Sequence, residues 1–405
     1  MTHQLRQYAI VTGCYWAFTM TDGALRMLVV LFFHNLGYSP IEVASLFLLY
    51  EFFGVVTNLV GGWLAARVGL NVTMQIGLLL QIVSLSMLLI DPSLLTVAYV
   101  MLAQALSGIA KDLNKMSAKS SIKLLVPEEA EGMLYRWVSV LTGSKNTLKG
   151  VGFFLGAMLL SVIGFQWTVG AMALLLTLVL LISLGLLDKS MGTTNFKPKF
   201  TDVFSKSTAI NRLSAARLFL FGSRDVWFVV ALPVYLQTQL QWTHMQVGML
   251  LALWIMGYGL VQTLAPGITG INNNRVPDGR TAFQWAVVLW VLPVLIAIAV
   301  WGGRSVEVML VVGLLAFGAV FAVNSSIHSF LIVSYAKSDG VSLDVGFYYM
   351  ANAAGRLFGT LLSGVVFQQF GLAACLLVSA SFVIAASVVS LSLPKRSLEK
   401  CQGSL

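Results

Sequence analysis

Apolar runs long enough to cross a lipid bilayer follow one another along almost the whole chain. A membrane span needs ~20 apolar residues, and turn signals such as Asp91-Pro92-Ser93 separate the runs. We predict twelve spans, at approximately residues 8–33, 41–66, 72–90, 94–117, 137–162, 166–187, 211–236, 245–269, 282–302, 308–334, 344–366 and 372–393. The predicted fold class is therefore an all-α membrane protein.

Composition agrees with this prediction. Hydrophobic residues make up 58% of the 405 residues and charged residues only 10%, whereas a soluble domain carries about 25% charged residues. The net charge of +9 does not indicate nucleic-acid binding, because the sequence offers no soluble domain to carry it. Basic cytoplasmic loops are the usual source of such a charge in membrane proteins.

The distribution of Lys and Arg predicts the orientation in the membrane. With both termini in the cytoplasm, the tails and inner loops hold 16 of the 25 basic residues, the spans hold eight, and the outer loops hold only Arg304. This bias is a strong positive-inside signal. We expect a multi-pass protein of the bacterial inner membrane with both termini cytoplasmic.

The spans divide into two halves around a polar stretch. We predict an N-terminal six-helix bundle at 1–187, a basic cytoplasmic linker at 188–210, and a C-terminal six-helix bundle with a short cytoplasmic tail at 211–405. A short repeat favours pseudo-symmetric halves, because residues 149–152 (KGVG) match residues 356–359 (RLFG). Chance similarity between glycine-rich helices explains this match equally well.

Ionisable side chains inside the spans are the strongest sign of function, since they are costly in a bilayer and usually face a protein cavity. Eight are basic: Arg26, Lys111, Lys115, Lys145, Lys149, Arg217, Arg224 and Arg356. Four are acidic: Asp22, Glu51, Asp112 and Asp225. The excess of four positive charges suits a cavity that binds an anion. We take the basic residues as candidate substrate ligands, with Asn146 and Asn324 beside them.

The spacing of charges predicts their roles within single helices. Lys111, Lys115, Lys119 and Lys123 recur every four residues and form one stripe on a helix. We expect Lys111 and Lys115 to guide an anion into the cavity, and Lys119 and Lys123 to lie in the inner loop.

Acids near these cations allow two interpretations. Asp22 and Arg26 are four residues apart and can pair on one face, which either orients the helix or leaves Arg26 for a substrate to compete for. A proton-coupled mechanism needs a carboxylate that titrates, and the four acids in the spans are the candidates. Asp112, flanked by lysines, is expected to be a structural partner.

Arg224 is the best single candidate for an anion ligand. Asp225 projects about 100° away from it on a helix, so we expect no direct pairing between them. A guanidinium binds phosphate or arsenate with two parallel hydrogen bonds. His328, one turn from Asn324, either senses pH or, as is more common for a lone histidine, is structural.

This layout resembles the major facilitator superfamily of secondary transporters. Residues 61–69 (GGWLAARVG) are similar to its G-x-L-A-D-R-x-G loop, in which Gly62, Arg67 and Gly69 match and Ala66 replaces the acid. The resemblance implies two six-helix bundles, with this loop at the cytoplasmic gate. The missing carboxylate implies that Arg67 pairs elsewhere.

Three segments resemble the ArsJ organoarsenical efflux branch of that superfamily: residues 48–58 (LLYEFFGVVTN), 105–120 (ALSGIAKDLNKMSAKS) and 218–228 (LFLFGSRDVWF). This resemblance implies export of 1-arseno-3-phosphoglycerate and arsenate resistance, with glyceraldehyde-3-phosphate dehydrogenase as a functional partner. The alternatives are a transporter of another small organic anion, or a proton-coupled drug or sugar transporter.

The sequence gives little support to an enzyme. It contains no nucleophile motif, no cluster of Cys and His for a metal, and no phosphate-binding GxxxxGK[ST] loop. We therefore expect a monomeric transporter, with no cofactor, that draws its energy from an ion gradient or from the gradient of its substrate.

Overall fold

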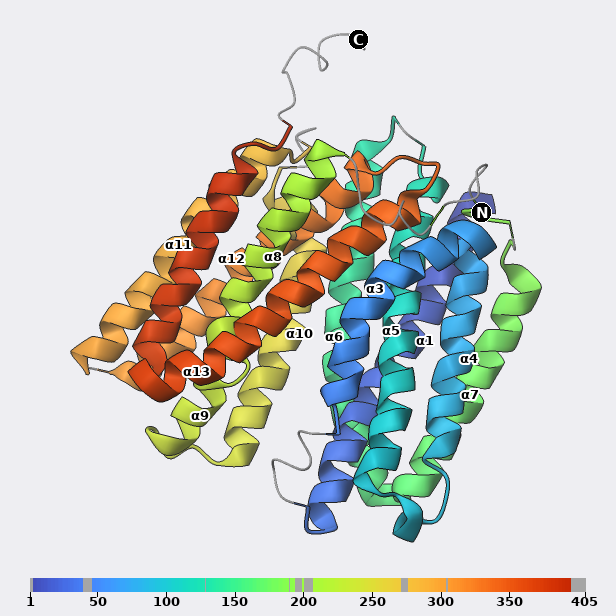
Figure 1. Cartoon of the computed structure of the whole chain (residues 1–405), viewed down its shortest axis with the longest axis horizontal. Helices are drawn as coiled ribbons and strands as arrows, with labels where there is room; N and C mark the ends of the chain where they lie inside the picture. Colours follow the sequence, from blue (N-terminus) through green and yellow to red (C-terminus); the bar gives the residue numbers. More distant parts are fainter. Residues whose placement is uncertain are drawn as a thin grey trace.

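The computed structural model describes residues 3–38, 46–127, 129–188, 190–193, 199, 207–270, 276–303 and 305–394. These residues contain helices and no strand, which confirms the predicted all-α class. The helices, drawn in Figure 1, are α1 (His3–Asn35), α3 (Leu48–Val68), α4 (Leu70–Met87), η1 (Pro92–Leu94), α5 (Val97–Leu125), α6 (Glu131–Ile163), α7 (Phe165–Leu186), α8 (Thr208–Phe228), α9 (Ala231–Thr238), α10 (His244–Ile268), α11 (Gly279–Gly302), α12 (Val306–Tyr335) and α13 (Val341–Ser390).

The number of membrane-length segments is consistent with twelve spans. In the described residues, ten helical segments are long and apolar enough to cross a bilayer, with α8 and α9 counted together as one. The charged helix α5, of 29 residues, is not among the ten. Helix α13 is two helices joined at Gly371, where a φ of 77° breaks the helical conformation. Adding α5 and dividing α13 gives twelve segments.

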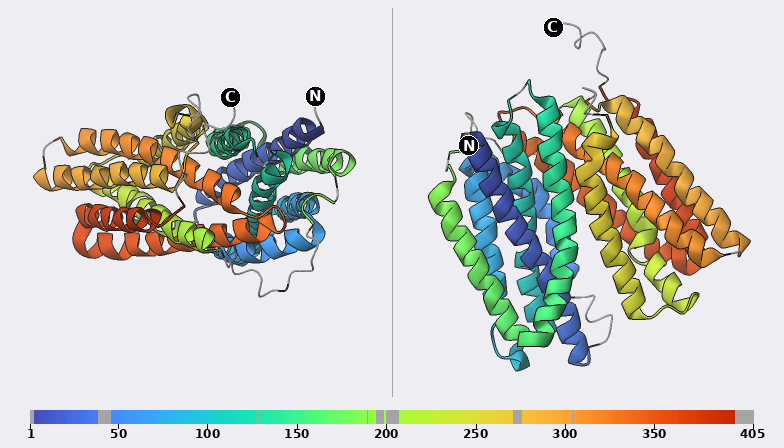
Figure 2. Two further views of the ribbon diagram at one scale, coloured as in Figure 1. Left: turned by 90° about the horizontal axis from the view of Figure 1, so that it is seen from above. Right: turned by 180° about the vertical axis from the view of Figure 1, so that it is seen from behind.

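The helices form two groups that lie side by side (Figures 1 and 2). One group contains α1 and α3 to α7, and the other contains α8 to α13. The first and last described parts of the chain lie at the same end of the molecule, which we call the terminal end. The predicted domain boundaries stay a prediction, and most of the predicted linker lies outside the described residues.

Glycines allow the same kind of helix contact in each half. A Cβ atom on Gly152 of α6 would lie 2.5 Å from the Met20 carbonyl oxygen of α1. A Cβ atom on Gly359 of α13 would lie 2.6 Å from the Gly222 carbonyl oxygen of α8. Both glycines belong to the short repeat predicted from the sequence, so the repeat marks equivalent close contacts of the backbone.

The two halves pack together at the terminal end. The Ser342 hydroxyl donates to the Gly62 carbonyl oxygen at 2.9 Å, and the Lys123 Nζ donates to the Ser334 carbonyl oxygen at 3.3 Å. The hydroxyls of Ser139 and Ser326 are 2.7 Å apart. Towards the opposite end the two groups of helices diverge (Figure 1). The two halves therefore contact each other at the terminal end, and their helices lie further apart towards the other end.

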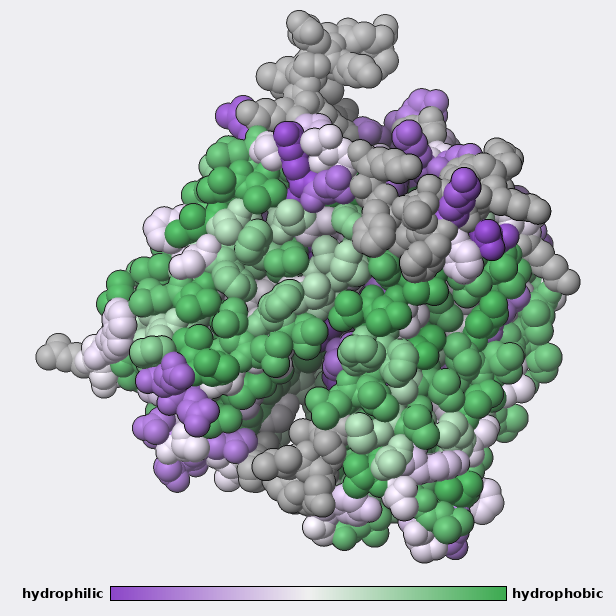
Figure 3. Space-filling view, in the orientation of Figure 1, coloured by the Kyte–Doolittle hydropathy of each residue, from purple (hydrophilic) through white to green (hydrophobic). Residues whose placement is uncertain are grey.

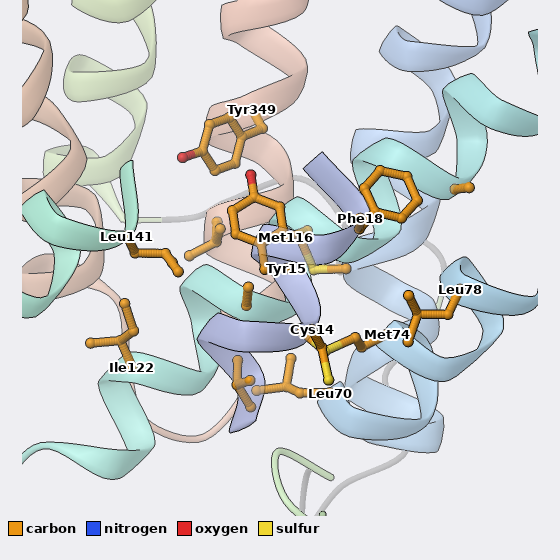
Figure 4. Packing of buried hydrophobic residues seen from close by; sticks show 14 of the residues in the cluster. Cys14, Tyr15, Phe18, Leu70, Met74, Leu78, Met116, Ile122, Leu141 and Tyr349 are labelled. Atoms are coloured by element: carbon orange, nitrogen blue, oxygen red, sulfur yellow. The ribbon is translucent and has the colours of Figure 1, made fainter. Parts of the chain in front are cut away.

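Surface and core follow this arrangement. Figure 3 shows hydrophobic residues over the sides of both groups, hydrophilic residues gathered towards the two ends, and a hollow between the groups. The terminal end contains a buried hydrophobic cluster to which both halves contribute. In Figure 4, Tyr349 of α13 lies next to Tyr15 of α1 within this cluster.

The close contact at Gly62 gives a stability prediction. In Gly62→Ala, the new Cβ would lie 2.5 Å from the Ser342 carbonyl oxygen, and we expect a loss of about 1–3 kcal/mol from overpacking. The control is Gly257→Ala in α10, where a Cβ meets nothing within 4 Å and alanine is the better helix former. Thermal unfolding in detergent measures both, and equal midpoints for the two variants would contradict the predicted contact.

Candidate functional site

The first ion pair of the interior joins α1 to α6. Lys149 Nζ lies 3.4 Å from Asp22 Oδ2, and the Tyr50 hydroxyl donates to Asp22 Oδ1 at 2.7 Å. Asp22 is buried, so these two partners compensate for the loss of water around its carboxylate. The predicted pairing of Asp22 with Arg26 is wrong, because the groups that contact Asp22, Lys149 and Tyr50, come from other helices.

Arg26 pairs instead with Glu51 of α3, with 2.9 Å between Nη2 and Oε1. Its guanidinium also lies 5.0 Å from the Phe47 ring and 5.1 Å from the Tyr50 ring. Both members of the pair are partly exposed, at 31% and 41% of their side chains. The pair is therefore less buried than the ion pairs of Asp112 and Asp225.

Asp112 neutralises lysines of its own helix α5. Its carboxylate lies 2.5 Å from Lys115 Nζ and 3.8 Å from Lys111 Nζ. The side chain of Asp112 is 2% exposed, which confirms the structural pairing predicted for it. Lys111 also lies 3.9 Å above the ring of Tyr50, which connects this group to Asp22.

In the other half, Asp225 holds two arginines. Arg224 Nε lies 2.6 Å from Oδ1, and Arg356 Nε of α13 lies 3.0 Å from Oδ2. The prediction that Asp225 would not pair with Arg224 is wrong. The angle between adjacent Cβ atoms does not limit a long arginine side chain, which bends back to reach the carboxylate.

Lys149 and Arg356 are equivalent in the two halves. Lys149 pairs with Asp22 on the first helix of its half, and Arg356 pairs with Asp225 on the first helix of its half. The repeat in the sequence thus corresponds to a repeated ion pair.

Three further basic residues have no acidic partner in the part of the chain that the structure describes. They are Lys119 of α5, Lys145 of α6 and Arg217 of α8. Arg217 is 3% exposed, and its Nε donates to Asn352 Oδ1 at 2.8 Å, while its Nη1 donates to the Ser325 carbonyl oxygen at 3.2 Å and to the Ser325 hydroxyl at 3.1 Å. The four carboxylates thus neutralise six of nine interior cations and leave these three.

The position of Lys119 differs from the prediction. We expected it in an inner loop, but α5 continues to Leu125 and the residue is 3% exposed. The predicted span ended too early because hydropathy falls where the lysines begin, whereas the buried helix continues. Lys123 lies in the last turn of α5 and reaches Ser334 in the other half.

Aromatic rings support the cations, which the sequence analysis missed. Tyr349 lies 4.4 Å from Lys115 Nζ and 5.4 Å from Lys119 Nζ. Arg217 lies 3.8 Å from the Phe221 ring. A cation over a ring face is stabilised electrostatically. The sequence contained one sign of this role. Tyr349 lies about one turn before Asn352 and two turns before Arg356 on α13, so it shares a helix face with two polar residues of the interior.

Polar side chains link the halves beside these cations. Asn146 Nδ2 of α6 donates to Gln262 Oε1 of α10 at 2.5 Å, and Gln262 Nε2 donates to the Ser325 hydroxyl at 3.2 Å. Since Ser325 accepts from Arg217, this network runs from one half to the other. Asn146 therefore lies with the charged groups, as predicted.

Two polar residues of α12 lie deeper in the protein. Asn324 is fully buried, and its Nδ2 donates to the Ala282 carbonyl oxygen of α11 at 3.5 Å. His328 is also buried, and its Nδ1 has no hydrogen-bond partner in the described residues. Neither is joined to the ion pairs by a direct hydrogen bond, and the role of Asn324 in substrate binding stays a prediction.

The predicted gate loop lies at the terminal end. Gly62 contacts Ser342 and Gly346 of α13. Arg67 lies 4.5 Å from the Trp63 ring, and Gly69 adopts a φ of 98° between α3 and α4.

The sequence model of the major facilitator superfamily matches residues 11–231 and 213–402. The chain belongs to the major facilitator superfamily. This assignment, with the helices described above, makes it a multi-pass membrane transporter rather than an enzyme. Among curated proteins, none matches the sequence.

Solved structures of this superfamily have the same fold. The human organic anion transporter MFSD10 is similar with a TM-score of 0.76 and 16% identity, over 96% of this chain and 100% of that chain. The Escherichia coli fucose:proton symporter FucP is similar with a TM-score of 0.74 and 10% identity, over 98% of this chain and 100% of that chain. A bacterial homologue of the iron transporter ferroportin is similar with a TM-score of 0.73 and 14% identity, over 96% of this chain and 99% of that chain. At these identities the similarity establishes the fold alone.

The ion pairs of Asp225 are buried whereas the Arg26–Glu51 pair is partly exposed, and this difference gives a second prediction. In Asp225→Asn, two arginines lose a partner that is 0% exposed, and we expect a loss of about 3–5 kcal/mol of unfolding free energy. In the control Glu51→Gln, the pair is partly exposed, and a loss of at most about 1 kcal/mol is expected. Unfolding in detergent by titration with sodium dodecyl sulfate measures both. A larger loss in Glu51→Gln would contradict the assignment.

Proposed function

We propose that this superfamily member is a secondary exporter of a small organic anion that carries a phosphate-type or arsenate-type group. The observation that supports this most directly is the charge of the interior, in which, among the described residues, nine basic side chains accompany four carboxylates. An excess of positive charge inside a membrane protein favours a negatively charged ligand, because the ligand removes repulsion that the protein leaves unbalanced.

The positions of the cations favour a ligand with charge at both ends. Arg26, Lys111 and Lys149 belong to one half, and Arg224 and Arg356 to the other. All five side chains retain some exposure. An anion with two charged groups can therefore contact both halves at once.

The most specific candidate substrate is 1-arseno-3-phosphoglycerate, which the resemblance to the organoarsenical efflux branch suggests. This ester carries negative charge at both ends. The similar MFSD10 is an organic anion transporter, which agrees with the chemical class. Export of the ester would confer arsenate resistance together with a glyceraldehyde-3-phosphate dehydrogenase that forms it.

Transport would proceed by alternating access. Contacts such as Gly62 with Ser342 join the halves at the terminal end, while their helices lie further apart towards the other end. With both termini in the cytoplasm, as the positive-inside bias predicts, this is the outward-facing arrangement. Separating the halves at Gly62 and rejoining them at the opposite end would expose the same cations to the cytoplasm.

A proton-coupled sugar or drug transporter is the second candidate, and the similar fucose:proton symporter FucP represents that class. Asp22, which accepts a hydrogen bond from Tyr50 and pairs with Lys149, is the carboxylate best placed for coupling. A lipophilic cation as substrate agrees poorly with the excess of positive charge.

Transport by everted membrane vesicles tests the proposal. Glyceraldehyde-3-phosphate dehydrogenase makes the substrate in place from glyceraldehyde 3-phosphate and arsenate, with NAD as the hydride acceptor. We expect vesicles that contain the protein to accumulate this product above the level in empty vesicles. In an arsenate-sensitive host, resistance should require both proteins. Accumulation equal to that of empty vesicles would exclude the arsenical substrate, and resistance without the dehydrogenase would indicate export of inorganic arsenate instead.

Arginine geometry at the site gives a fourth prediction. Arg224→Lys keeps the charge but loses the paired hydrogen bonds of a guanidinium, so we expect a rise in KM of about tenfold or more. Arg212 is a matched control, because it is exposed on the same helix and donates to the Ser392 carbonyl oxygen. Arg212→Lys should transport normally. Equal KM values in both variants would remove Arg224 from the binding site.

A further inference from the structure

Three interior cations differ from the rest because none of the carboxylates that the structure describes lies within ion-pair distance of them. Lys119 and Lys145 come from α5 and α6 of one half, and Arg217 comes from α8 of the other. Every other interior cation lies within 4 Å of Asp22, Glu51, Asp112 or Asp225. The three therefore form a separate group, which we call the unpaired cluster.

Aromatic rings connect two members of this cluster. Lys119 Nζ lies 5.4 Å from the Tyr349 ring, and the Arg217 guanidinium lies 5.2 Å from the Tyr348 ring. The two tyrosine rings meet edge to face at 5.2 Å. Lys119 and Arg217 thus flank one tyrosine pair of α13, where the two halves come together near the terminal end.

Electrostatics within the cluster is repulsive. The charges that act on Lys119 are those of Arg217, Lys145 and Lys115, all positive. The strongest charge interactions of Lys145 are likewise with basic groups: Lys115, Lys149, Arg356 and Lys111. Lys119 and Arg217 are each 3% exposed. Charges that are buried and unpaired in this way are costly unless a counterion joins them.

Hydrogen-bond donors are also left over. Neither Lys119 nor Lys145 donates a hydrogen bond within the described part of the chain. Arg217 uses Nε and Nη1, which leaves the Nη2 donors of its guanidinium. The buried Tyr348 hydroxyl likewise has no hydrogen-bond partner among the described residues. Unused donors on three cations and a hydroxyl suit the several acceptor oxygens of a tetrahedral oxyanion.

We propose that Lys119, Lys145 and Arg217 bind the doubly charged, phosphate-type end of the substrate, deeper than the cations paired with Asp22, Glu51 and Asp225. This inference rests on the proposed function in one respect, that the substrate is an anion. It adds a distinct subsite and a role for Lys119. Because the ligands come from both halves, a bound oxyanion stabilises contact between them at the terminal end.

Inorganic phosphate is the probe for this subsite, with the full-length protein in lipid nanodiscs and chloride at equal ionic strength as the reference. We expect phosphate to raise the thermal midpoint of the wild-type protein. In Lys119→Met, the ligand-free midpoint should equal or exceed that of the wild type, because an unpaired buried charge is gone. Its phosphate-dependent rise should disappear, and radiolabelled phosphate should bind about tenfold or more weakly.

Two variants serve as controls. Lys123→Met lies one turn further along the same lysine stripe, where its Nζ contacts the Ser334 carbonyl oxygen, and it should keep the phosphate response. Lys119→Arg keeps the positive charge and should also keep the phosphate response. The subsite is refuted if wild-type protein binds no phosphate, if Lys119→Met keeps the response, or if its ligand-free midpoint falls.

Failure of this inference can be told apart from failure of the proposed function. If phosphate binding depends on Lys119, Lys145 and Arg217 but the arseno-ester is not transported, the proposed subsite stands and the arsenical substrate is excluded. If the arseno-ester is transported but Lys119→Met binds phosphate as the wild type does, the proposed function stands and the subsite is excluded.

Discussion

Four carboxylates, three of them buried, set the arrangement of charge between the two halves. In a medium of low dielectric constant, a basic side chain is held most strongly by the nearest acid, and each carboxylate here contacts one or two cations. Asp225 illustrates this, because it is fully buried and holds both Arg224 and Arg356. With the four acids used in this way, Lys119 contacts a tyrosine ring, and Arg217 contacts an aromatic ring, an asparagine side chain and Ser325. The excess of positive charge is thus a consequence of the unequal numbers of basic and acidic side chains among the described residues.

Close helix packing is what brings these charges together. Gly152 and Gly359 let α6 and α13 approach the first helix of their own half, and the ion pairs Lys149–Asp22 and Arg356–Asp225 join the same two pairs of helices. A larger side chain at either glycine would separate the helices that carry the charges. The equivalent construction in both halves favours a binding site that each half completes for the other.

Hydropathy predicted most of the fold, because helices in lipid must bury apolar surface and satisfy their own backbone. It was least accurate where the interior is polar. The end of α5 was predicted before Lys119 because lysines lower the hydropathy and are typical of a loop. In the structure α5 continues to Leu125, and the Lys119 side chain is buried among neighbouring helices. The pairing of Arg224 was misjudged because a helical wheel describes Cβ directions, not the reach of a guanidinium. Tyr349 was missed because the sequence around it does not show which side chains from other helices lie over its ring.

The sequence by itself determined the helices, the two related halves and the excess of interior positive charge, because each depends on composition or on spacing along one chain. Only the tertiary structure decided which cations are neutralised. The pairs Lys149–Asp22, Arg26–Glu51 and Arg356–Asp225 each join different helices, so their formation depends on how helices pack and not on distance in sequence. That packing leaves Lys119, Lys145 and Arg217 without an acidic partner among the described residues, although all three lie on helices that also carry paired charges.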